Sequence, residues 1–144
     1  MPIEIPRRLH DRMVEHARAE APNEACGVLA GVEGKAVEIF PMTNAEASPT
    51  IYRFDEREQL RVFDEVERSG WALLAFFHSH THTEAYPSPT DIRDAHWKDP
   101  VSGEATPAYP GTRYVIVSLA HGSPDVRAFT FESGEPVEEE VRIT

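Results

Sequence analysis

The stretch that decides the fold is an apolar run ending in two histidines: Trp71-Ala72-Leu73-Leu74-Ala75-Phe76-Phe77, then His78-Ser79-His80. A short continuous apolar run is typical of a buried strand. Residues i and i+2 of a strand point to the same face, so His78 and His80 converge while Ser79 faces away or packs into the sheet. The sequence therefore predicts a buried strand that ends where a metal ion could bind.

The segment after this strand adds a hydroxyl and a carboxylate. Ser88-Pro89-Thr90-Asp91 favours a helix start, because Ser caps helices well and Pro suits the first helical position. Asp91 falls in the first turn, from which the intervening loop can fold it back to the strand end. Two histidines and one carboxylate form a hydrolytic zinc site with a fourth position for water. We therefore expect His78, His80 and Asp91 to hold one Zn²⁺ with a bound water.

Length, composition and charge limit the possible partners. The chain has 144 residues, with 14 basic and 25 acidic side chains and a net charge of −11. This length suits one domain over residues 1–144. Nucleic acid and anionic membranes are not expected as partners, because phosphate binding needs clustered Lys and Arg. Cys26 alone excludes an internal disulfide, and neither a signal peptide nor a membrane span is evident, so we expect a cytoplasmic protein.

Hydrophobic spacing and turn residues divide the chain into helices and strands. We expect helices over 7–20, from Asp55 to Gly70 and from Ser88 to about Lys98. Strands are expected at 24–30, 36–40, 71–77, 114–119, 126–131 and 137–143, with a short one near 51–54. The second helix should place Leu60, Phe63 and Val66 or Glu67 on one face. Residues 99–111 should form a loop, and the last two strands a hairpin. The result is an α/β (α+β) fold: a central mixed or antiparallel sheet flanked by helices.

The combined pattern resembles the JAMM (MPN-plus) metalloproteases. It reads His-x-His, seven residues, Ser, two residues, Asp, with a glutamate on an early strand. The upstream segment, residues 24–31, is similar to the family's Glu-x-Cys-Gly-apolar-Leu-x-Gly strand, and Asn44 matches the connecting region. The resemblance covers roughly residues 5–131. It implies the JAMM/MPN (cytidine-deaminase-like) fold and a zinc-dependent peptidase.

The resemblance also implies a role for each polar position. His78, His80 and Asp91 are the implied zinc ligands, Glu24 the general acid/base, and Ser88 the residue that stabilises the oxyanion. These roles are chemically consistent. A carboxylate beside the attacking water can take its proton and pass it to the leaving amine, and a hydroxyl can stabilise the developing negative charge.

Three segments point to one group within this family by resemblance: residues 25–31, 41–50 and 83–88. They look like peptidases of a cysteine-biosynthesis pathway, which release cysteine from the C-terminus of a ubiquitin-like sulfur carrier. The implied partner is a carrier with a flexible Gly-Gly tail, which could bind as an added strand. The alternatives are a JAMM protease that trims other ubiquitin-like or sulfur-carrier tails, a metal-binding protein without hydrolysis, and a non-catalytic MPN scaffold. The oligomeric state stays open.

Other residues near the motif have two interpretations each. His82 continues the alternation of His78 and His80, and is either a further ligand or a residue on the substrate side. Cys26 is either a small buried residue or a thiol that regulates the site. Glu84, Tyr86 and Pro87, in the loop over the site, either contact substrate or shape the loop.

Overall fold

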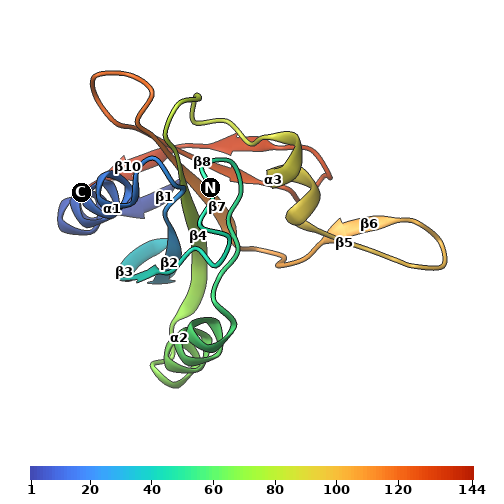
Figure 1. Ribbon diagram of the computed structural model, residues 1–144. Coiled ribbons are helices and arrows are strands. Elements are labelled where there is room, and N and C mark those ends of the chain that lie inside the picture. Colours follow the sequence, from blue (N-terminus) through green and yellow to red (C-terminus); the bar gives the residue numbers. More distant parts are fainter.

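A large curled sheet forms the centre of the computed structural model, which describes residues 1–144 (Figure 1). Its strand order is β10-β1-β3-β2-β4-β7-β8-β9. The strands are β1 (Ile3–Ile5), β2 (Cys26–Val32), β3 (Lys35–Met42), β4 (Ala72–His80), β7 (Arg113–Ser118), β8 (Asp125–Thr130), β9 (Val137–Glu139) and β10 (Val141–Ile143). The pairs β4–β7, β1–β3 and β1–β10 are parallel and the other pairs antiparallel. The expected central mixed sheet is confirmed.

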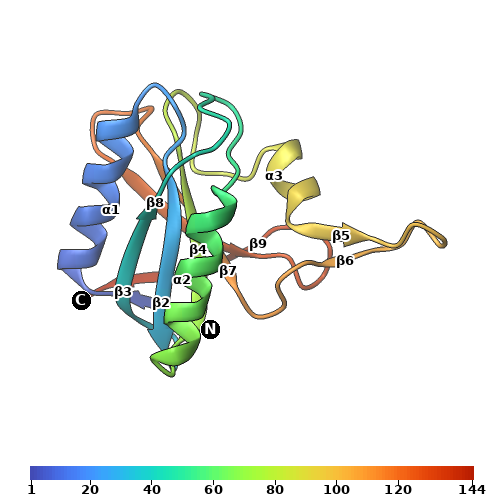
Figure 2. The same ribbon diagram turned by 60° about the horizontal axis from the view of Figure 1, so that its bottom comes forward.

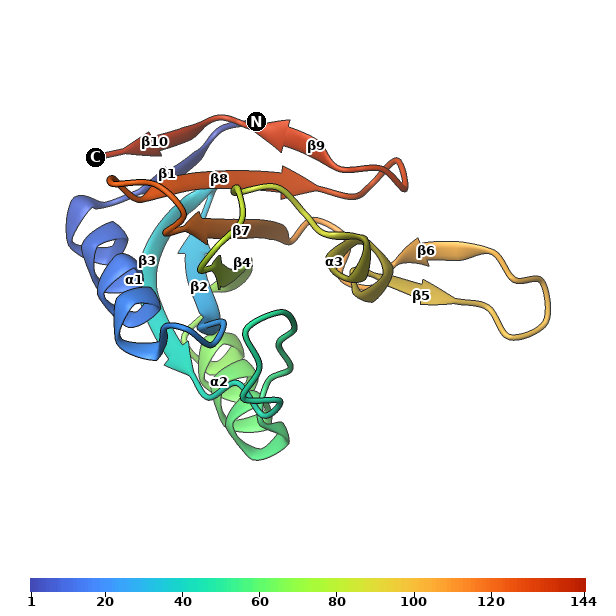
Figure 3. The same cartoon turned by 45° about the horizontal axis from the view of Figure 1, so that its top comes forward.

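The C-terminal segment connects the two edges of this sheet. β9 pairs with β8 at one edge, whereas β10 pairs with β1 at the other, and Glu140 alone separates them (Figure 3). The Ile3 N–H donates to the Glu140 carbonyl, and the Thr144 N–H to that of Ile5. The expected hairpin is therefore right for residues 137–139 and wrong for residues 141–143. The latter residues do not pair with β8 but cover the exposed edge of β1.

Helix α1 (Arg7–Glu20) packs on one face of the sheet, as the sequence predicts. It buries Leu9, Met13, Val14 and Ala17 against side chains from both halves of the sheet, including Leu29, Phe77 and Val115. The members of this cluster are all apolar. Burial of this apolar stripe holds the helix in place.

Helix α2 (Glu56–Arg68) packs on the opposite face, so that β2 and β3 lie between the two helices (Figure 3). Asp55 caps it by accepting hydrogen bonds from the Arg57 and Glu58 N–H groups. Val62 and Val66 are buried, but Leu60 is 74% exposed, so its expected place on the apolar face is wrong. Leu60 lies two residues before Val62 and hence on the far side of the helix. None of the helices is long and apolar enough to span a bilayer.

The third helix is shorter than expected. α3 (Pro89–Asp94) ends at the cap residue Ala95, and the chain then forms β5 (His96–Lys98), which pairs with β6 (Ala105–Pro107). This two-stranded arm projects from the body of the protein (Figure 2). The helix to Lys98 and the unstructured loop 99–111 are both corrected, because pairing between distant residues overrides local helix preference.

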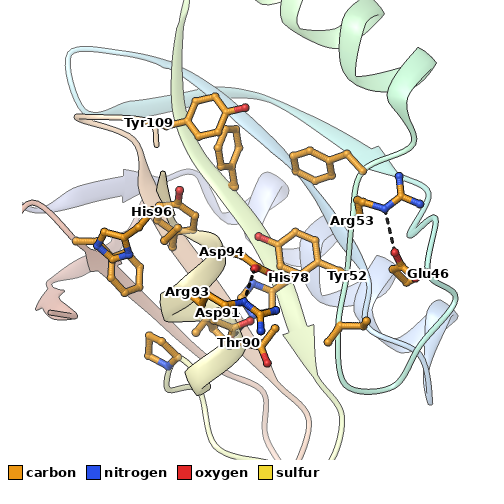
Figure 4. Close-up of a pocket in the computed structure, with 18 of the residues that line it drawn as sticks. Glu46, Tyr52, Arg53, His78, Thr90, Asp91, Arg93, Asp94, His96 and Tyr109 are labelled. Carbon is orange, nitrogen blue, oxygen red and sulfur yellow. Dashed lines mark hydrogen bonds and ion pairs between the residues drawn. The ribbon is translucent and has the colours of Figure 1, made fainter. Parts of the chain in front are cut away.

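The segment between β3 and α2 contains no strand. Of the strand expected near 51–54, only Phe54 pairs, in an isolated bridge with Asn44. The ends of this segment therefore lie together, and its intervening residues form a compact loop beside the end of β4 (Figure 4).

Candidate metal centre and active site

The alternation of β4 brings the two histidines to one face, as predicted. His78 and His80 are buried on the face that carries α2, and their side chains converge. Ser79 faces the other way, where its Oγ accepts a hydrogen bond of 2.8 Å from the Ala25 N–H. The end of the strand thus presents two imidazoles to one point.

The structure brings Asp91 to the same point. The His78 Nε2 and His80 Nε2 atoms are 3.2 Å apart, and each is 3.1 Å from Asp91 Oδ2. Figure 4 shows His78 and Asp91 of this group. Tetrahedral zinc, with bonds to nitrogen and oxygen of about 2.0–2.1 Å, places its ligand atoms roughly 3.3 Å from one another. The three atoms therefore fit one zinc ion and leave a fourth direction open.

Hydrogen bonds fix two of these three side chains. The His80 Nδ1–H donates to the Glu84 carbonyl at 2.8 Å, which leaves Nε2 to face the triangle. Asp91 Oδ2 accepts from the Ser88 N–H, and Ser88 Oγ accepts from the Asp91 N–H. This reciprocal capping box at the start of α3 holds Ser88 beside the triangle.

The buried charges around the triangle reinforce one another. Burial by itself would raise the pKa of Asp91, but the hydrogen bonds of His78, His80 and the Ser88 backbone hold it well below its ordinary value. Burial lowers the pKa of His80, but the bonds to Asp91 and Glu84 outweigh this and raise it. The site therefore favours positive charge next to a carboxylate that stays ionised.

Glu24 lies just before β2 and is 3% exposed. Its backbone is anchored at both ends: its N–H donates to the Ser48 carbonyl, and its carbonyl accepts from the Asn44 amide. The side-chain Oε1 is buried without a hydrogen-bond partner. Burial, helped by the charge of Asp91, raises the pKa of Glu24 to about 8. A carboxyl with these properties is suited to exchanging a proton near neutral pH.

The structure distinguishes between the interpretations of three residues near the motif: His82, Cys26 and Glu84. His82 is exposed and lies outside the group formed by His78, His80 and Asp91. Cys26 is fully buried, and burial raises the pKa of its thiol to about 12, so the thiol stays protonated and a poor nucleophile. Glu84 contributes its backbone carbonyl to His80.

A cavity of about 730 Å³ opens beside the triangle (Figure 4). Its walls come from the loop between β3 and α2, from α3, and from the start of the arm. Aromatic side chains form much of the lining: Tyr52, Phe54, Phe76, Tyr109, Tyr114 and Phe131. Sequence reasoning missed Tyr52, which stacks on His78, because nothing in an irregular loop indicates which residue faces the site.

A model of the prokaryotic homologues of the JAB domain matches residues 6–132. The chain belongs to this family. The resemblance to the JAMM metalloproteases is thereby confirmed. The named peptidase relatives described next support the expectation of a hydrolase.

Two relatives of this JAB-family chain are peptidases by name. It is 41% identical to the CysO-cysteine peptidase of Mycobacterium tuberculosis over 138 residues. The aligned region covers 94% of this chain and 86% of the relative. The chain is 35% identical over 134 residues to a probable TtuB-protein conjugate cleaving protease of Thermus thermophilus, covering 92% and 78%.

Two solved structures share the fold of this JAB-family chain. A protein from Desulfitobacterium hafniense superposes with a TM-score of 0.79 at 30% identity and covers 100% of this chain and 93% of that one. A JAB1/MPN domain protein from Archaeoglobus fulgidus gives 0.58 at 20% identity, covering 97% and 99%. The expected JAMM/MPN fold is confirmed.

Proposed function

We propose that this protein is a zinc-dependent peptidase that hydrolyses the bond after the C-terminus of a ubiquitin-like sulfur carrier and releases cysteine from a carrier–cysteine adduct. The observation that carries the proposal is the buried carboxyl of Glu24, whose Oε1 has no partner, beside a triangle of atoms that fits zinc. The 41% identity to a CysO-cysteine peptidase supports the substrate.

The proposed roles follow from the positions of the side chains. His78, His80 and Asp91 would hold the zinc, which when bound acidifies a water and polarises the scissile carbonyl. Glu24 takes a proton at its free Oε1 and later delivers it to the leaving amine. Ser88 Oγ accepts from the Asp91 N–H, so its own hydroxyl hydrogen remains free to stabilise the developing oxyanion.

The cavity supports a flexible tail as the substrate. It reaches the triangle at His78 and Asp91, and its aromatic walls suit an extended chain with small residues next to the scissile bond. Lys98 lines the same cavity and takes part in no ion pair with a carboxylate of the protein. We propose that the Gly-Gly tail of the carrier enters through this cavity and that Lys98 attracts the carboxylate of the terminal cysteine.

The test is incubation of the zinc-loaded protein with a sulfur carrier that bears a C-terminal cysteine. Intact-mass analysis should show the loss of one cysteine and no further trimming. Glu24→Gln, assayed with the same zinc content, is the matched control and should leave the adduct intact. A carrier that keeps its cysteine under conditions where the protein holds stoichiometric zinc would overturn the proposed substrate.

A second candidate is cleavage of carrier–protein conjugates, which the Thermus relative favours. The same carrier joined through an isopeptide bond to a lysine of a folded protein distinguishes the two. The primary proposal predicts a higher kcat/KM for the cysteine adduct than for this conjugate.

The single free cysteine, buried and protonated, suits the proposed action in the reducing cytoplasm.

A further inference from the structure

The two histidines of the triangle are oriented in different ways. The His80 Nδ1 donates to the Glu84 carbonyl, the usual arrangement for a metal-binding histidine, in which an acceptor for the second ring nitrogen fixes the orientation of the ring. The His78 Nδ1 is buried and has no hydrogen-bond partner. The contacts of His78 with Asp91 and His80 are made by Nε2, the atom that faces the triangle, so no hydrogen bond at the second ring nitrogen sets the orientation of the ring.

Tyr52 supplies a flat surface against this ring. The Tyr52 and His78 ring centroids are 4.6 Å apart with an interplanar angle of 22°, a stacked arrangement (Figure 4). His80 meets His78 from another side, with 5.0 Å between centroids and an angle of 61°. The His78 ring thus lies nearly parallel to the ring of Tyr52, whereas the His80 ring is steeply inclined to it.

The loop that carries Tyr52 is held in place by Asn44. The Asn44 amide nitrogen donates to the carbonyls of Glu24 and Ile51, both at 3.0 Å. Its oxygen accepts from the N–H groups of Glu46, at 3.0 Å, and Arg53, at 3.2 Å. A carboxamide can make four hydrogen bonds, and this buried one makes all of them.

Further bonds close the same loop. The Ala45 N–H donates to the Arg53 carbonyl, and the Arg53 guanidinium pairs with Glu46 at 2.9 Å. At the start of the loop, Glu58 of α2 accepts from the backbone and hydroxyl of Thr43. Tyr52 is therefore presented by a preorganised segment, and the Asn44 side chain that holds the segment also holds the backbone of Glu24.

We infer that Tyr52 is a positioning residue for His78, whose imidazole it holds by stacking so that Nε2 faces the metal. Tyr52 does for His78 what the Glu84 carbonyl does for His80. The inference rests on the zinc site proposed above, but it requires no particular substrate.

The test compares Tyr52→Met, which removes the flat ring, with Tyr52→Phe, which keeps it. Zinc affinity is measured by competition with a chromophoric chelator, and no activity assay is needed. Tyr52→Met should raise the zinc Kd by about 10–100-fold, the usual cost of losing a residue that orients a ligand. Tyr52→Phe should stay within about twofold of the wild type, because the stacked ring remains.

Two further measurements separate positioning from general packing. The Co²⁺-substituted Met variant should show altered visible absorption, since the metal geometry changes, whereas the Phe variant should match the wild type. Phe63→Met is the matched control. Phe63 stacks on Phe76 on the same face of the sheet and makes none of the aromatic contacts of His78. It should leave zinc affinity and the cobalt spectrum unchanged.

Several results would overturn the inference. The first is a Met variant that binds zinc as tightly as the wild type, and the second is an equal loss in Phe63→Met. If Tyr52→Met fails to fold, as judged by thermal unfolding without metal, Tyr52→Leu is measured against the same criteria. A wild-type protein that binds no zinc would refute the metal site itself, and this result is separable because it precedes any variant.

Discussion

The two faces of the large sheet differ in what strand β4 places on them. Toward α1 it presents Phe77 and Ser79, where Phe77 joins an all-apolar cluster and Ser79 bonds to the backbone. Toward α2 and the cavity it presents Phe76, His78 and His80. One strand thus supplies packing to one face and chemistry to the other.

The two faces also differ in their buried polar atoms that lack a hydrogen-bond partner. There are three: Glu24 Oε1, His78 Nδ1 and His96 Nε2. The first two belong to the candidate active site, and His96 lines the cavity. An unsatisfied buried polar group typically costs about 1–3 kcal/mol. The face that carries the candidate active site is therefore less stable than it could be. Substitutions there should mainly lower activity, whereas substitutions on the α1 face should mainly lower stability.

The largest expected effect is on catalysis at the site face. Glu24→Gln removes the proton acceptor but keeps the shape of the side chain, so kcat should fall by about 10²- to 10⁴-fold. Zinc content should be unchanged, because Glu24 is not one of the three atoms of the triangle. Turnover of the cysteine adduct and elemental analysis of the same sample check both statements. Wild-type turnover in this variant would remove Glu24 from the mechanism.

Ser88→Ala should give the next largest effect. Loss of a donor to an oxyanion typically lowers kcat by about 10²- to 10³-fold, whereas loss of an N-cap costs only about 1 kcal/mol of stability. Ser88→Thr keeps both the cap and the hydroxyl and should retain most activity. For both variants, kcat measures the effect on catalysis and the midpoint of urea unfolding measures the effect on stability. A drop in stability with full activity would make Ser88 a cap alone.

Much of the site could be predicted from the sequence because its signals are local. The alternation of His78 and His80, the capping box of Ser88 and Asp91, and the apolar stripe of α1 each depend on neighbours a few residues apart. Backbone geometry translates such spacing directly into a shared face. The zinc triangle then needs only a short loop to close.

The features that were missed depend on partners far along the chain. Residues 96–98 become a strand because 105–107 pair with them, and 141–143 leave β8 because the edge of β1 lies open to them. Tyr52 reaches His78 because Asn44 folds the loop between them. No periodicity in these segments distinguishes such outcomes, since tertiary pairing overrides local preference.

The pH dependence of stability should carry the signature of Glu24. Its pKa is 4.5 when exposed and about 8 in the folded protein, so between these values the native state keeps a proton that the unfolded chain has released. The free energy of unfolding of the metal-free protein should therefore fall as pH rises through this window and level off above it.

The matched comparison is metal-free Glu24→Gln, which lacks this group. Relative to the variant, the wild type should lose roughly 2–4 kcal/mol between the two ends of the window. Urea titrations of both proteins at several pH values, with chelator present, measure the difference. Parallel curves would show that Glu24 titrates normally and that its burial has no consequence for stability.

The smallest effect expected on activity comes from the α1 face. Phe77 is 1% exposed and packs directly over Gly27, where an added Cβ would lie 2.4 Å from the ring. Phe77→Leu should cost about 1–3 kcal/mol of stability, because the cavity that it leaves cannot fully close. Zinc affinity and kcat should remain as in the wild type.

Phe76→Leu is the control on the other face, since Phe76 is similarly buried but lines the cavity. It should lower stability by a comparable amount and also raise KM for the carrier adduct. Urea unfolding and steady-state kinetics on both variants decide the matter. If Phe77→Leu shifted KM as much as Phe76→Leu does, the faces would be coupled through the strand. The alternation of β4 would then not separate packing from chemistry, because the sheet would transmit strain from one core to the other.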